Sequence, residues 1–98
     1  MQALEYNAVM KTPIGYRIGF AIVQITDQIV SGCIRFFEKE GKYQGTIDSN
    51  GNMTIQGEMP APNEIIKFNG IGKISFYSLH LELSTVNFVY ELDGTARR

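Results

Sequence analysis

The single histidine is the first residue whose chemistry has to be weighed, because imidazole is the side chain that ordinarily titrates near neutral pH. Ser78 precedes His80 by two residues, and Glu91 falls in the next segment of alternating polarity. A nucleophile, a base and an orienting carboxylate can be drawn from these three residues. Alternating strands bring such residues together often, and this face is expected to be solvated. We therefore interpret His80 as a surface residue and predict that the chain is not an enzyme.

The single cysteine, Cys33, excludes an intrachain disulfide and any zinc site built from cysteines. Arg35 lies two residues away on the same face, where its charge could lower the pKa of the thiol. A buried cysteine that acts as a small hydrophobic residue is the commoner arrangement. We therefore predict a packing role for Cys33.

Oxygen-bearing side chains gather in the segment around Asn50-Gly51, where Asp48 and Asn52 could offer ligands to calcium. Only Asp48 is charged, and the ligand spacing of an EF-hand is absent, so these are predicted to be turn residues. Gly70-Ile71-Gly72 lacks the third glycine and the following helix of a dinucleotide-binding loop. The sequence thus predicts neither a metal nor a cofactor.

Composition indicates one folded domain over residues 1–98, since 44% of the residues are hydrophobic and 19% are charged. The net charge of −1 argues against nucleic acid and anionic membranes as partners. No run of about twenty apolar residues and no secretory leader pattern is present. The expected location is the cytoplasm.

The clearest structural signal is a β-hairpin centred on Asn50-Gly51. A three-residue loop over 49–51, with Gly51 in the left-handed region, opposes Ile47 to Met53 and Thr46 to Thr54. This register makes one face of the hairpin apolar and the other polar, whereas a two-residue loop mixes them.

Alternating polarity predicts further strands on both sides of this hairpin, at about residues 4–11, 16–26, 29–38, 64–68, 71–83 and 86–93. A turn at Asp27-Gln28 opposes Gly19 to Phe36 and Arg17 to Glu38. A loop centred on Glu40-Gly41 then opposes Phe36 to Gly45, which places the ring between two glycines.

Two turns are predicted in the second half of the chain. Asn69-Gly70 is a second hairpin signal. A loop at Ser84-Thr85 opposes Leu81 to Phe88 and His80 to Val89. Leu79 and Tyr77 are then expected to point inward with Leu81.

Eight short strands joined by tight turns predict an all-β, antiparallel up-and-down meander that closes into a small barrel. A two-sheet β-sandwich is the alternative. The segments that begin at Gly32 and Gly72 resemble each other, which would fit a duplication of two four-strand halves, although convergence of two meanders explains it as well.

The interior of such a barrel holds either its own side chains or one small ligand. A filled core is the favoured prediction, and the alternative function is a carrier of a small apolar ligand. Its cavity would open near four residues, namely Tyr6, Arg17, Glu38 and Tyr43. An ion pair between Arg17 and Glu38 at the rim is the simpler explanation for two of them.

The outer face of the first three strands carries an unusual set of apolar residues: Val9, Ile18, Phe20, Ile22, Ile29, Cys33 and Phe37. A contiguous apolar patch on a folded surface is typical of association. The leading prediction is therefore a non-catalytic binding or scaffold module that forms a homo-oligomer, with a two-fold dimer favoured. The alternative is that a second sheet covers this face.

Overall fold

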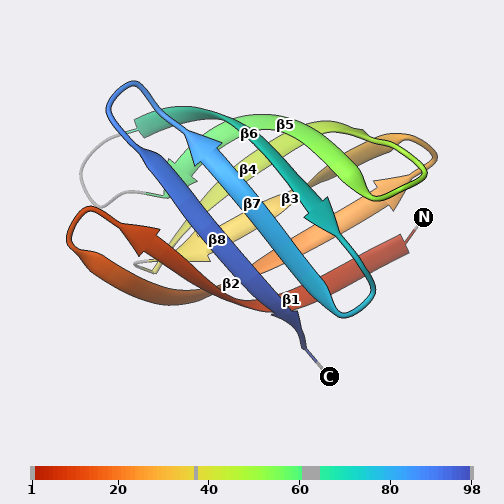
Figure 1. Ribbon diagram of the computed structural model, residues 1–98, viewed down its shortest axis with the longest axis horizontal. Coiled ribbons are helices and arrows are strands. Elements are labelled where there is room, and N and C mark those ends of the chain that lie inside the picture. The colour runs from red at the N-terminus through yellow and green to blue at the C-terminus, as the bar shows by residue number, and fades with distance from the viewer. Residues whose placement is uncertain (1, 37, 61–64, 98) are drawn as a thin grey trace.

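The computed structural model describes residues 2–36, 38–60 and 65–97, and these form eight antiparallel strands in a closed barrel (Figure 1). Each strand pairs with the next one in the chain, and β1 also pairs with β8, so the predicted up-and-down barrel is confirmed over the sandwich. The strands are β1 (Gln2–Thr12), β2 (Gly15–Thr26), β3 (Ile29–Phe36), β4 (Lys39–Ile47), β5 (Asn52–Pro60), β6 (Ile65–Ile74), β7 (Ser78–Ser84) and β8 (Val89–Ala96). No helix long and apolar enough to cross a membrane occurs in these residues.

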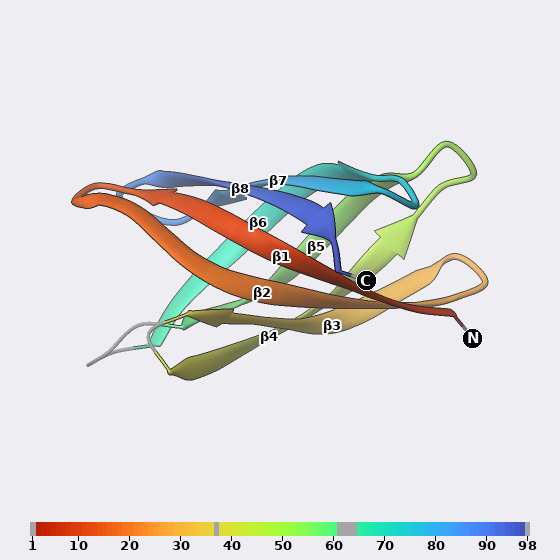
Figure 2. The same ribbon diagram turned by 90° about the horizontal axis from the view of Figure 1, so that it is seen from below.

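The strands are strongly staggered around the barrel. In the β1–β2 ladder, Lys11 pairs with Tyr16. If the paired residues are instead traced from Lys11 around the barrel in the other direction, from β8 through β7, β6, β5, β4 and β3, the trace returns to β2 at Thr26. That position lies ten residues further along β2, and such a shear requires the strands to tilt steeply against the barrel axis. The barrel is also flattened, with extents of 34 × 27 × 17 Å (Figure 2).

Inward-pointing side chains fill the barrel, because alternate residues of every strand face the axis. The buried set includes Leu79 and Leu81, as predicted, together with Phe68, Ile74 and Leu83 from β6 and β7. Tyr77 is a correction: it lies between β6 and β7 and is 69% exposed. The buried side chains form one hydrophobic cluster inside the barrel.

The β4–β5 hairpin has the predicted register. Ile47 pairs with Met53 and Thr46 with Thr54. Gly51 adopts a φ of 86°, in the left-handed region, and its N–H donates to the carbonyl oxygen of Asp48 at 3.2 Å. The carboxylate of Asp48 in turn accepts hydrogen bonds from the backbone N–H of Asn50 and Asn52, at 2.8 and 3.0 Å.

The β2–β3 register is also as predicted, with Ala21 opposite Ile34. The expected contact between Gly19 and Phe36 is present, since a Cβ atom at Gly19 would lie 2.7 Å from the ring. A side chain at that position would displace the ring.

The predicted β3–β4 register is wrong. Phe36 pairs with Lys39, and the turn between the strands contains Glu38 in the left-handed region, with φ 60°. Gly45 pairs with Val30 instead of Phe36. Because the error is six residues, an even number, every β4 side chain keeps its predicted face.

Tyr43 is the aromatic residue that lies between two glycines. A Cβ atom at Gly32 would lie 2.7 Å from the Tyr43 hydroxyl, and one at Gly57 would lie 2.8 Å from Tyr43 Cβ. The glycines of β3 and β5 therefore make room for this side chain.

The hairpin predicted at Asn69-Gly70 is also wrong, because β6 runs through both residues to Ile74. A Cβ atom at Gly70 would lie 2.9 Å from side-chain atoms of both Ile55 and Leu83, so this glycine provides packing space rather than a turn. The turn lies beyond Ile74, where the N–H of Ser78 donates to the Ser75 hydroxyl at 3.1 Å.

The β7–β8 register differs from the prediction by four residues. His80 pairs with Asp93 and Leu81 with Leu92, and the loop covers residues 85–88. The faces are again unchanged. The two similar segments begin at Gly32 in β3 and Gly72 in β6, which are not equivalent strands of two four-strand halves, so the strand order does not support a duplication.

Candidate functional site

Two of the four residues expected at the barrel mouth lie in the core instead. Tyr6 and Tyr43 are buried, and their hydroxyls donate to the carbonyl oxygens of Ser75 and Ile22, at 2.6 and 2.7 Å. Burial raises the pKa of both phenols, so both remain neutral donors. Both hydroxyls therefore have backbone partners within the barrel wall.

The other two mouth residues do not form the predicted pair in the ladder. The β2–β3 ladder ends at Phe20 and Arg35, before it would reach Arg17 and Glu38. Arg17 is half-buried and donates to the carbonyl oxygen of Tyr16 at 2.8 Å, whereas Glu38 is exposed in the β3–β4 turn. The two tyrosine hydroxyls already donate to backbone carbonyl oxygens, so these donors are not available to a ligand inside the barrel.

The outer face of β1–β3 does carry a contiguous apolar surface. Val9 pairs with Ile18 and Ile22 with Cys33, and Phe20 lies between these pairs on β2. Tyr16 extends the row and is 68% exposed, while Ile18 is 85% exposed. We call this surface the apolar ridge; it consists of Val9, Tyr16, Ile18, Phe20, Ile22 and Cys33.

Sequence reasoning missed Tyr16 of the apolar ridge, although the signal was present, because every outward position of β2 from residue 16 to residue 22 is apolar. Ile29 is exposed but does not join the ridge, since the polar pair Gln24–Ser31 separates it from Ile22. Phe37 lies outside the described residues.

Arginine side chains flank the centre of the ridge. The guanidinium carbons of Arg35 and Arg97 lie 5.9 and 5.7 Å from the centroid of the Phe20 ring. A cation near an aromatic ring contributes about 0.5–1 kcal/mol at an exposed site. Ile18, at 85% exposure, is the most exposed member of the ridge.

The Cys33 thiol is half-buried on the outer face of β3. Burial raises its pKa, and a hydrogen bond and the charge of Glu40 act in the same direction, against the smaller opposing effects of Arg35 and Lys42. A thiol with a raised pKa is a poor nucleophile at neutral pH. Cys33 is therefore a half-buried residue of the outer face whose thiol is not activated as a nucleophile.

His80 has a different partner from the one drawn from the sequence. Its Nδ1 lies 2.7 Å from Asp93 Oδ1, and Ser78 pairs with Thr95 on the neighbouring strand. Both His80 and Asp93 are well exposed, so this pair is worth about 0–1 kcal/mol. Ser78 and Glu91 do not join His80 in a hydrogen-bonded triad.

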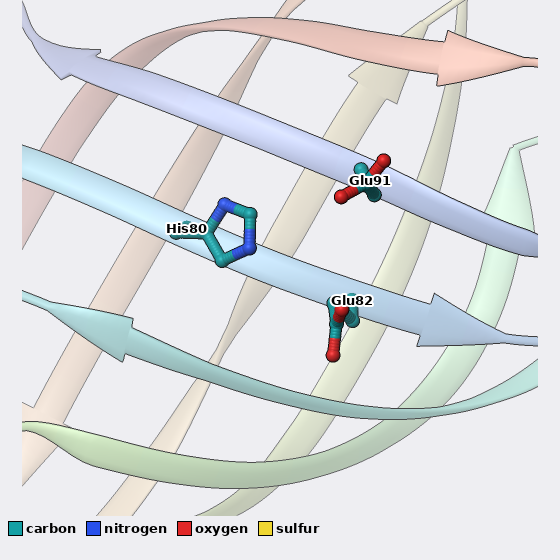
Figure 3. Close-up of side chains that lie close together, drawn as sticks. All are labelled: His80, Glu82 and Glu91. Atoms are coloured by element: carbon teal, nitrogen blue, oxygen red, sulfur yellow. The ribbon is translucent and has the colours of Figure 1, made fainter.

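Two carboxylates lie beside His80 on the outer face of β7 and β8 (Figure 3). Potential ligand atoms of His80, Glu82 and Glu91 all lie within 4.8 Å of one another. Glu82 and Glu91 are directly opposed, and Lys11 and Lys73 lie on the strands at either side. The ammonium groups of Lys11 and Lys73 offset the repulsion between the Glu82 and Glu91 carboxylates, so a bound cation is not needed to reduce it. We therefore assign no metal to this cluster.

Comparison of the chain with protein-family models, curated proteins and solved structures gave no match.

Proposed function

We propose that the chain is a non-catalytic β-barrel module that associates with a second copy of itself through the apolar ridge. The observation that carries this proposal is the run of apolar residues at successive outward positions of β2, which includes Tyr16 and Ile18 at 68% and 85% exposure. Apolar side chains this exposed gain free energy when a partner covers them.

Closure of the barrel limits how a partner can bind, and a second copy is the simplest partner. Every described strand has two neighbours, so no free edge is available for strand addition. Association must then use side chains of the outer face. A two-fold axis brings the same ridge of each copy together and makes every contact twice.

The charges beside the ridge fit this arrangement. Glu5 pairs with Ile22 on the β1 side, and Arg35 pairs with Phe20 on the β3 side. A two-fold axis parallel to β2 would place the β1 side of one copy against the β3 side of the other. Glu5 of each copy would then lie level with Cys33 of its partner, two residues along β3 from Arg35, so unlike charges are nearer than in the orientation that opposes β1 to β1.

The six side chains of the ridge are fewer than the about 20 residues that each partner contributes to a standard stable interface. We therefore expect a dimer whose dissociation constant lies in the micromolar range. Light scattering across that range should show a mass that rises from monomer to dimer. A monomer at every concentration would contradict the proposal.

The matched variants are Ile18→Glu and Ile71→Glu. Ile71 is also outward-facing and exposed, but it lies on β6, away from the ridge. Ile18→Glu should abolish the dimer because it buries a carboxylate in the interface, whereas Ile71→Glu should leave the dimer intact. Equal effects of both substitutions would show that the ridge is not the interface.

A further inference from the structure

A groove of about 1070 Å³ crosses the outer face of the barrel; it meets the apolar ridge at Cys33, which lines both, and extends away from Tyr16 and Ile18. It extends from β2 across β3, β4, β5 and β6 to the loop after β7. Along this groove, one residue of each strand is paired with a residue of the next strand, so that the paired residues form a continuous row. This row, which we call the amide row, consists of Gln24, Ser31, Gln44, Gln56, Asn69 and Ser84.

Every member of the amide row is polar and uncharged. Each carboxamide or hydroxyl group can both donate and accept a hydrogen bond, unlike a lysine, which only donates, or a carboxylate, which only accepts. Within the described part of the chain, the four carboxamides make no hydrogen bond to another residue. The groove therefore presents a line of side-chain donor and acceptor groups along the paired strands.

Charged residues of the groove do not favour an ion of either sign. Lys42 and Lys67 line it together with Glu40 and Glu58. Two cations and two anions give no net charge, and Glu58 pairs directly with Lys67. A phosphorylated or sulfated ligand would find a carboxylate beside each ammonium group, so a neutral ligand fits better.

The spacing of the amide row distinguishes between neutral ligands. Equivalent residues of adjacent strands lie about 4.8 Å apart. That is close to the length of one pyranose ring in an extended sugar chain, whereas consecutive residues of an extended peptide are only about 3.3 Å apart. A sugar chain laid across the strands can therefore present hydroxyls to successive members of the row.

From this geometry we infer that the groove binds a neutral oligosaccharide, whose hydroxyl groups exchange hydrogen bonds with the amide row. Val86, in the loop at one end of the groove, is 97% exposed and offers an apolar contact for the C–H face of a sugar ring. This inference does not depend on self-association, because the central members of the row lie on β4 and β5.

The test uses cellohexaose, maltohexaose and chitohexaose as probes, each titrated to millimolar concentration into the ¹⁵N-labelled full chain. We expect at least one to shift the side-chain NH₂ resonances of Gln44, Gln56 and Asn69 in a saturable manner. The double substitution of Gln44→Ala with Gln56→Ala should weaken that binding at least about tenfold, or about 1.4 kcal/mol. Gln28→Ala is the matched control, because Gln28 is exposed in the β2–β3 turn, outside the groove.

Three results would overturn the inference. The first is the absence of any shift with all three sugars while the protein remains folded. The second is a saturable shift with hexaglycine but with none of the sugars, which would make a peptide the occupant. The third is binding restricted to a heparin fragment and lost in Lys42→Gln, which would assign recognition to the cations.

Discussion

The buried tyrosines show how single residues can mislead a search for a site. An aromatic ring with a hydroxyl near one end of a barrel is a reasonable candidate for a ligand contact. In this barrel the hydroxyl of Tyr6 instead donates to the Ser75 carbonyl oxygen in the β6–β7 turn, and that of Tyr43 donates to the Ile22 carbonyl oxygen of β2. Both rings are core residues whose polar ends need a partner once they are buried.

Removing one hydroxyl tests this role. We expect Tyr43→Phe to lower the free energy of unfolding by about 1–2 kcal/mol, because it leaves the Ile22 carbonyl oxygen without this donor. Tyr16→Phe, on the exposed ridge, should change it little. Urea unfolding monitored by circular dichroism measures both, and equal stability of Tyr43→Phe and the parent chain would contradict the role.

Asp48 gives a second residue-scale prediction, concerning pH. Hydrogen bonds from the backbone and side chain of Asn52 lower the pKa of the Asp48 carboxyl, with a smaller contribution from Lys73. Because the folded-state pKa is below the unfolded one, this carboxylate stabilises the fold above the ordinary aspartate range. That contribution is lost as the pH falls through the lowered pKa.

The Asp48→Asn substitution keeps an acceptor oxygen and removes the charge. Its destabilising effect should therefore be largest near neutral pH and should shrink as the pH is lowered past the ordinary range of an aspartate. Denaturant titrations at a series of pH values measure this difference. An effect of constant size at every pH would show that the charge of Asp48 is not involved.

At the scale of elements, glycines explain both the successes and the failures of sequence-based reasoning. Asn50-Gly51 was a reliable turn signal because Gly51 has a positive φ. Asn69-Gly70 carries the same letters, but Gly70 is a packing residue between Ile55 and Leu83. A local pattern cannot distinguish these uses, because the difference lies in contacts with strands distant in the sequence.

The position of the β3–β4 turn was mispredicted for a related reason. The sequence predicts the turn at Glu40-Gly41 because glycine favours turns, whereas the chain reverses earlier, with Glu38 in the left-handed region. Both wrong registers differ from the observed ones by an even number of residues. The inner and outer faces were therefore predictable even where the partners of individual residues were not.

The candidate surfaces were predictable to different extents. Most of the apolar ridge follows from alternation along β1–β3 alone, since it needs only the face of each residue. The amide row could not be found in this way, because it depends on the registers of five successive ladders. The β3–β4 ladder among them was mispredicted.

The packing role of glycine is testable at Gly19. A Cβ atom there would overlap the carbonyl oxygen of Arg35 and press on the Phe36 ring. We expect Gly19→Ala to cost at least about 2 kcal/mol of the free energy of unfolding. Thermal unfolding gives the measurement, and Thr26→Ala, at an exposed position of the same strand, is the control. A stability equal to that of the control would show that β2 and β3 are not packed as closely as described.

For the whole molecule, closure of the barrel is the contact of longest range. The β1–β8 ladder joins the two ends of the described chain, whereas all other ladders join neighbours. The entropy of closing a loop grows with its length, so pairing across this seam is expected late in folding. Local hairpins such as β4–β5 are expected to form earlier.

Substitutions at two buried residues can distinguish early hairpin formation from late closure of the barrel. Leu92, in β8, and Ile55, in β5, are both almost completely buried, and truncation of either to alanine should cost about 2–5 kcal/mol. Leu92→Ala should mainly accelerate unfolding, whereas Ile55→Ala should also slow folding. Stopped-flow measurements over a range of urea concentrations separate the two rates. A folding rate reduced equally by both substitutions would contradict late closure.

The continuous ladder around the barrel also bears on how this protein could change over evolutionary time. Each strand is held by two neighbours through backbone hydrogen bonds, and inward side chains alone fill the core. Substitutions on the outward positions can then accumulate without disturbing the fold. The wall of the barrel thus has one side constrained by packing and another that is free to acquire new partners, so related chains with this fold could differ widely in what they bind.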